Sequence, residues 1–296
     1  ESGFPGFSQT RPFEIPMRCL GTLSKLQRTD LGATVYAGVG VGIASAGLLC
    51  LAASVRSIPP DQLWLLLALL SVALGVPVAL VLRRLPAIPA AHGGEAGGSG
   101  PVPRGTAPLI LCYGIMGYGY ILPATFLPFL ASKVVTDPAV FGWAWPIFGL
   151  TAAVSTWAAG KAMRLLTRLQ VWSVCQLLMG IGAVLPSLWP YGLAIVLSAV
   201  LVGGTFMVIT LMGVQEIRGR VNWDAGKWVG YLTAAFALGQ IAGPVASLLF
   251  LQDERSAQRA LDMSLQSAAM LLLISAGWLW REANVSTHKK EMQSAQ

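Results

Sequence analysis

Residues 112–131 read CYGIMGYGYILPATFLPFLA, a run of twenty residues without a charged side chain. A helix needs about 20 consecutive apolar residues to cross the hydrocarbon core of a bilayer, so this run predicts a membrane-spanning helix. Tyr113, Gly117 and Tyr120 would share one face of that helix, because they are four and three residues apart. Thr125 would lie on a second face.

The whole chain has the composition of a membrane protein. Of its 296 residues, 55% are hydrophobic and only 11% are charged, and the mean hydropathy is +0.65. A typical soluble domain has about 25% charged residues, so this chain holds too few to cover an apolar core with a polar surface. A lipid-facing surface needs no such cover. The composition excludes a disordered chain and argues against a soluble globular domain.

Eight apolar runs are long enough to cross a bilayer. They cover roughly 33–55, 62–82, 108–131, 139–160, 169–187, 191–214, 228–251 and 264–280. Apolar residues continue around each predicted helix, which distinguishes a span from an amphipathic surface helix. The sequence therefore predicts an all-α fold, a polytopic membrane bundle of eight transmembrane helices.

Polar stretches divide these spans into groups. Residues 1–32 form a polar, proline-containing segment with no run long enough to span. Residues 84–107 are rich in glycine and proline, which is typical of a flexible linker. The linker separates two spans at 33–83 from six spans at 108–282, and a cytoplasmic tail is expected at 283–296.

The basic residues predict which side of the membrane each loop faces, because cytoplasmic loops carry an excess of Lys and Arg. With the N-terminus in the cytoplasm, 16 of the 20 basic residues fall on the cytoplasmic side and 4 on the other. Both termini are therefore expected in the cytoplasm. The same rule explains Arg164 and Arg168 in the short turn at 159–170. It also accounts for the net charge of +7 without a nucleic-acid partner, since the basic residues are scattered between apolar runs.

No chemistry of a catalytic kind is visible. The middle of every predicted span lacks Asp, Glu, Lys, Arg and His, and an intramembrane charge would be the usual mark of a proton relay. The sequence also lacks a nucleophile motif, a phosphate-binding loop and a cluster with metal-ligand spacing. We therefore predict no enzyme, no catalytic residue, no cofactor and no metal.

Several side chains inside the spans could line a substrate pathway, each with a structural alternative. Tyr113, Gly117 and Tyr120 could face a cavity or allow close helix packing. Gln240 could face a polar pathway or make a hydrogen bond between helices, and Gln176 is a similar, weaker case. Thr205 could line the pathway or bond its own backbone.

Residues that could kink or loosen the predicted helices form a second group of candidates. A proline inside a membrane helix bends it, because neighbouring groups re-satisfy the freed carbonyl. The candidates for conformational change are Pro123, Pro146, Gly243 and Pro244.

The chain resembles a known family, the major facilitator superfamily, in its bacterial YbfB/YjiJ-like branch. The most specific stretches are YGIMGYGYILPATFLPFLA at 113–131 and FGWAWPIFGLTAAVSTWAAG at 141–160. Weaker ones are GQIAGP at 239–244 and YAGVGVGIASAGLL at 36–49. The turn around Gly160, Arg164 and Arg168 looks like a degenerate copy of the superfamily's Gly/Arg-rich loop. The resemblance covers about residues 30–283.

The resemblance implies a secondary transporter of the bacterial inner membrane, with two six-helix halves around a midplane site. In that plan, residues 33–82 look like helices five and six, and 108–282 look like the C-terminal half. Residues 1–28, in the polar segment 1–32, do not look like helix four, so we expect an N-terminally truncated chain that does not transport alone. Proton coupling stays open, because the coupling carboxylates of many members lie in the part without a counterpart here.

The sequence thus supports a transporter of a small organic solute working by alternating access. A lining rich in aromatic and hydroxyl groups but poor in charge suggests a neutral or weakly polar substrate. The alternative is a complete eight-helix scaffold or assembly subunit without transport activity. Four more apolar runs in the upstream reading frame would favour the transporter, and a start codon near Glu1 would favour the scaffold.

Overall fold

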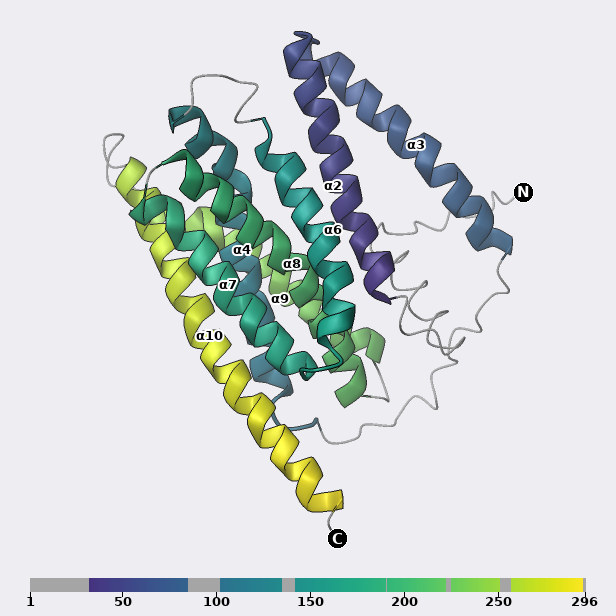
Figure 1. Cartoon of the computed structure of the whole chain (residues 1–296), viewed down its shortest axis with the longest axis vertical. Coiled ribbons are helices and arrows are strands. Elements are labelled where there is room, and N and C mark those ends of the chain that lie inside the picture. Colours follow the sequence, from purple (N-terminus) through teal and green to yellow (C-terminus); the bar gives the residue numbers. More distant parts are fainter. Residues whose placement is uncertain are drawn as a thin grey trace, which may run out of the picture.

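The computed structural model describes residues 32–84, 102–134, 142–189, 191–221, 225–250 and 257–294, and these ranges contain eight helices and no strand. The helices are α2 (Gly32–Val55), α3 (Pro60–Arg84), α4 (Thr106–Val134), α6 (Ala144–Ala162), α7 (Arg168–Leu188), α8 (Gly192–Arg220), α9 (Ala225–Phe250) and α10 (Ala257–Ser294). Figure 1 shows them as a bundle of long helices. The predicted all-α membrane bundle is confirmed. Residues 1–31 and 85–101, which hold most of the predicted polar segment and linker, lie outside the described residues.

Seven of these helices are long and apolar enough to cross a membrane by length and composition, within the described ranges. The helix outside this set is α6, which corresponds to the predicted span 139–160 but begins only at Ala144 and has 19 residues. At 1.5 Å per residue it measures about 28 Å, close to the thickness of the hydrocarbon core. The later start places Pro146 in the first turn, where a missing N–H costs no intrahelical hydrogen bond.

The bundle has two layers. In the front layer of Figure 1, α10, α7, α8, α6 and α2 lie side by side, and each contacts the next. In the second layer α4 and α9 pack along each other, and α4 also contacts α7, α8 and α10. The central helix α8 is therefore covered on both sides, and Val202, Ile209, Leu211 and Met212 on it are fully buried. Apolar contacts of this kind form the core of the six helices α4 to α10.

Helix α2 packs against α6 with almost no side chain between the two backbones. A Cβ at Gly40 would lie 2.7 Å from the carbonyl oxygen of Gly149, and one at Gly47 would lie 2.8 Å from Pro146. Ala33 at the start of α2 lies beside Gly160 at the end of α6, so the two helices run antiparallel. Small residues at a membrane helix crossing allow this close approach.

Helix α3 diverges from the bundle. Figure 1 shows it leaving α2 at their shared connection and running away from the other helices. Its apolar side chains are exposed along its length, among them Trp64, Leu69 and Leu74, which are 71%, 60% and 64% exposed. Such a helix is stable as a separate element only in lipid or against a partner, because water would face its apolar surface.

Candidate functional site

The glycine-containing face of α4 lies against α9. A Cβ at Gly114 would lie 3.1 Å from the carbonyl oxygen of Ala235, and Gly117 faces the backbone of Phe236. On the opposite helix, Gly239 faces the backbone of Gly114. These glycines let α4 and α9 approach closely. Gly117 therefore lies at a close helix–helix contact.

Aromatic side chains from four helices meet in one group. We call Tyr113, Tyr120, Phe148, Phe206 and Phe236 the aromatic cluster. The ring of Tyr120 stacks on Phe206, with centroids 5.0 Å apart and planes 27° apart, and lies 6.1 Å from both Phe148 and Phe236. The ring of Tyr113 lies 5.6 Å from Phe236. These spacings are those of favourable aromatic pairs, each worth about 0.5–1.5 kcal/mol beyond its buried area.

The cluster joins α4, α6, α8 and α9 at one place. Phe148 and Phe206 are 2% and 6% exposed, whereas Tyr120 and Phe236 are half-buried. The half-buried rings present an aromatic surface with one hydroxyl and no charge. Such a surface can stack on a flat or apolar solute, but it offers no partner for an ionised group.

The other predicted pathway residues do not belong to the aromatic cluster. Thr205 is buried, and its hydroxyl donates to the carbonyl oxygen of Leu201 at 2.7 Å. Gln240 is half-buried on α9, and the described residues give its amide no hydrogen bond. Thr125 is exposed near the far end of α4.

The remaining candidates for conformational change occupy different environments. Pro123 is buried in α4, Gly243 is buried on α9 against Ile121, and Pro244 is exposed one residue further on. Gly243 and Pro244 therefore occupy neighbouring positions, one at the α4–α9 contact and one on the outer face of α9. Their part in a conformational change stays a prediction.

A buried polar network on Gln176 is more extensive than the sequence indicates. Its Oε1 accepts from the indole N–H of Trp172 at 2.8 Å, and its Nε2 donates to the carbonyl oxygen of Cys112 at 3.0 Å and to Ser275 at 2.8 Å. The amide is fully buried. It connects α7 to both α4 and α10, so Gln176 makes the inter-helix hydrogen bonds. The feature in the sequence that could indicate this role is a single amide in an apolar run, and Gln240 has the same feature.

Charged side chains gather at the end of the bundle where the α6–α7 turn and the end of α8 lie, which we call the basic end. Arg220 donates to Glu216 at 2.8 Å, one turn earlier on α8, and to Glu282 on α10 at 3.2 Å. It also reaches the carbonyl oxygen of Arg104 at 3.4 Å, just before α4. This partly buried group links the end of α8 to α10 and to the residues just before α4.

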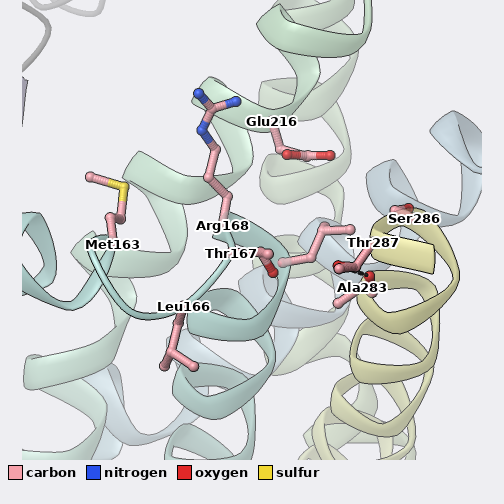
Figure 2. A pocket seen from close by; sticks show the side chains of 9 residues that line it. Met163, Leu166, Thr167, Arg168, Glu216, Ala283, Ser286 and Thr287 are labelled. Atoms are coloured by element: carbon pink, nitrogen blue, oxygen red, sulfur yellow. Dashed lines mark hydrogen bonds between the residues drawn. The ribbon is translucent and has the colours of Figure 1, made fainter. Parts of the chain in front are cut away.

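A pocket lies next to this group, between the α6–α7 turn, α8 and α10. Its volume is about 440 Å³, and it is lined by Met163, Leu166, Thr167, Arg168, Leu169, Glu216, Ala283, Ser286 and Thr287. Figure 2 shows Arg168 from α7, Glu216 from α8, and Ser286 and Thr287 from α10 around it. Arg164 lies in the same turn, is exposed, and does not line the pocket.

The fold and these sites define a multi-pass membrane protein: long apolar helices, uncharged mid-span stretches, and charges gathered at the ends. The chain belongs to the family described as "Uncharacterised MFS-type transporter YbfB", which matches residues 17–279. The match begins within the polar segment 1–32 and so extends further toward the N-terminus than the resemblance at 30–283. No curated protein and no solved structure matches the chain. The protein is thus a membrane transporter of the major facilitator superfamily, a non-enzymatic kind.

Proposed function

We propose that this protein is part of a secondary active transporter for a small, neutral or weakly polar organic solute, and that the aromatic cluster contributes to the solute's binding surface. Family membership supports transport in general. The aromatic cluster supports the choice of solute, because Tyr120 and Phe236 offer stacking surfaces and a hydroxyl but no charge. An ionised solute would lose its hydration there without gaining a partner.

The position of the cluster fits a mechanism in which helices move against one another. Its rings come from α4, α6, α8 and α9, so a shift between these helices changes the surface that a solute meets. In alternating access, bundles move around a site near the bilayer midplane. A binding surface shared by several helices couples solute binding to that movement, because the solute binds one arrangement better than the other.

We further propose that the protein lies in the bacterial inner membrane with both termini in the cytoplasm. The support is the 16-to-4 distribution of basic residues over the two sides. The antiparallel run of α2 and α6 is consistent with loops that alternate between two sides.

The solute proposal is tested with the purified full chain and a panel of probes in matched sets: neutral aromatic alcohols and amides, and the corresponding carboxylates and amines. The shift in thermal unfolding midpoint reports binding. Neutral members should stabilise the protein more than their charged counterparts. Tyr120→Ala should weaken binding of the best neutral probe about three- to tenfold, the value of a lost aromatic pair.

The matched control is Trp157→Ala, which removes an aromatic ring that is 54% exposed on α6 outside the cluster. It should leave probe affinity within about twofold of the original. Equal stabilisation by charged probes, or unchanged affinity in Tyr120→Ala, would contradict the proposed solute class. Stabilisation by no probe at all would contradict the proposed role of the aromatic cluster in binding this class of solute.

A further inference from the structure

The pocket at the basic end has a divided chemistry. Met163, Leu166, Leu169 and Ala283 give it an apolar part, and Arg168, Glu216 and three hydroxyl side chains give it a polar part. Figure 2 shows the side chains of Leu166 and Arg168 pointing in opposite directions. A ligand that fits both parts has an apolar end and a polar end.

Within the polar part, Arg168 is the side chain that can bind a negative group. Glu216 is already bound by Arg220 at 2.8 Å, and Arg220 also binds Glu282. Arg168, by contrast, forms no salt bridge with any acidic side chain of the described ranges, and its guanidinium lies against Gly219, 3.0 Å from the position of an added Cβ. The guanidinium therefore lies close to Gly219 at the end of α8, without an acidic partner in the described ranges.

The charge around the pocket extends along the chain. No Asp or Glu occurs between Asp137 and Glu216, whereas Lys161, Arg164 and Arg168 lie within eight residues of one another. All three basic side chains are exposed. The α6–α7 turn is thus a local source of positive potential, which attracts anionic groups at a membrane surface.

The turn also carries the marks of the membrane–water boundary. Leu165 and Leu166 are 88% and 37% exposed between Arg164 and Arg168. Just before them, the ammonium of Lys161 lies 4.1 Å from the ring centroid of Trp157, and tryptophan favours this boundary. Exposed leucines beside arginines are stable where acyl chains meet head groups, because the leucines contact acyl chains and the arginines contact polar head groups.

We infer that this pocket binds the head group of an anionic phospholipid. The phosphate oxygens accept hydrogen bonds from the Arg168 guanidinium and the Ser286 hydroxyl, and the glycerol and upper acyl chain lie along Leu166 and Leu169. Guanidinium and phosphate make strong, charge-assisted hydrogen bonds. The hydroxyls of Thr167 and Thr287 are used within the protein, with Gln170 and the carbonyl oxygen of Ala283 as partners. They shape the pocket without being donors to the lipid.

The test measures lipid binding by the purified full chain in a neutral detergent, with phosphatidylglycerol as the anionic probe and phosphatidylcholine as the neutral lipid. Thermal unfolding and native mass spectrometry report the bound lipid. Phosphatidylglycerol should bind at least about tenfold more tightly than phosphatidylcholine, the value of a hydrogen bond to a charged group. Arg168→Gln should remove about that preference, whereas Arg164→Gln, which loses the same charge in the same turn outside the pocket, should change it less than about twofold.

A second pair of variants keeps the test independent of the arginines. Ser286→Trp fills the pocket and should abolish the preference for phosphatidylglycerol, whereas Asn284→Trp, exposed on the same helix, should keep it. Equal losses in Arg168→Gln and Arg164→Gln would show a general charge effect and overturn the inference, as would full binding by Ser286→Trp. Binding of glycerol phosphate or inorganic phosphate as tightly as phosphatidylglycerol would show a site for a soluble phosphate instead. None of these readouts uses transport, so a negative result here is distinguishable from a failure of the proposed function.

Discussion

Gln176 and Gln240 have the same side chain in comparable apolar runs, yet the bundle gives them different roles. Gln176 is fully buried and joins α7 to α4 and α10 by hydrogen bonds. Gln240 is half-buried on α9 without a hydrogen bond from the described residues. A buried amide in a membrane helix is stable where it has hydrogen-bond partners, because burying an unpaired amide costs free energy. Gln176 is therefore a structural residue, whereas a role of Gln240 toward a solute stays a prediction.

This difference predicts opposite outcomes for the same substitution. Gln176→Leu leaves the buried indole N–H of Trp172 without its acceptor and removes the donor to Ser275 Oγ and to the carbonyl oxygen of Cys112, so we expect a loss of about 1–3 kcal/mol in the free energy of unfolding. Gln240→Leu should change it by less than about 0.5 kcal/mol. Unfolding in mixed detergent and SDS measures both. A larger loss for Gln240→Leu would contradict this assignment.

Solute effects at the residue scale should follow the aromatic cluster. In a transport-competent protein that contains these helices, Tyr113→Phe, Tyr120→Ala and Gln240→Leu should alter solute transport more than they alter expression. The reason is that Tyr113→Phe keeps the ring and Gln240 is half-buried without a hydrogen bond from the described residues. Tyr120→Ala removes ring contacts with three neighbours, so its rate in particular must be corrected for expression. Transport rate divided by the amount of protein in the membrane is the measurement. Loss of expression with an unchanged normalised rate would support a packing role instead.

At the scale of helices, the α2–α6 contact depends on the absence of side chains. A Cβ at Gly149 would collide with the backbone of Ala44 and lie 2.7 Å from the carbonyl oxygen of Gly40. Gly42, on the same α2 helix, has open space around it, with nothing within 4 Å. The contact can accommodate a methyl group only if the two helices move apart, because both clashing groups belong to the main chain.

Gly149→Ala should therefore lower the free energy of unfolding by about 1–3 kcal/mol, as overpacking does in tight contacts. Gly42→Ala is the matched control and should leave stability unchanged or raise it by up to about 1 kcal/mol, since alanine favours helix over glycine. Thermal unfolding of the two purified variants compares them directly. Equal stability would show that α2 and α6 separate without cost.

Helix positions could be predicted from the sequence because charge marks where a membrane helix ends. The third run is bounded by Arg104 and Lys133, and the structure places α4 at Thr106–Val134. The end of α10 could not be predicted in this way, because beyond the membrane a polar helix looks like any polar segment. The helix continues to Ser294, through most of the expected tail.

The site was predictable only in part, for a physical reason. Tyr113 and Tyr120 stand out as aromatic residues in a glycine-rich span, and both lie in the aromatic cluster. Their neighbours Phe148, Phe206 and Phe236 are ordinary apolar residues in three other runs, and only packing brings them together. The pocket at the basic end combines a turn, the end of α8 and the end of α10, so no local pattern marks it.

At the scale of the whole molecule, the two ends of the bundle should face different compartments. Ser57 between α2 and α3 and Leu165 between α6 and α7 lie at opposite ends, because α2 and α6 run antiparallel (Figure 1). In a background without the native cysteines, Ser57→Cys should react with a membrane-impermeant maleimide in intact cells. Leu165→Cys should react only after the inner membrane is opened. The reverse pattern would show the opposite orientation and contradict the cytoplasmic termini.

Helix α10 has a practical consequence for imaging a protein of this size. Its 38 residues make a continuous rod of about 57 Å, and a bilayer core takes up only about 30 Å of it. The rod is therefore longer than the core by about 27 Å, or about five turns divided between its two ends, without a break. A rigid helical partner domain fused in register after Ser294 would inherit its direction, with no hinge between them. Such a fusion supplies the asymmetric mass outside the micelle that single-particle alignment of a 31.2 kDa membrane protein lacks.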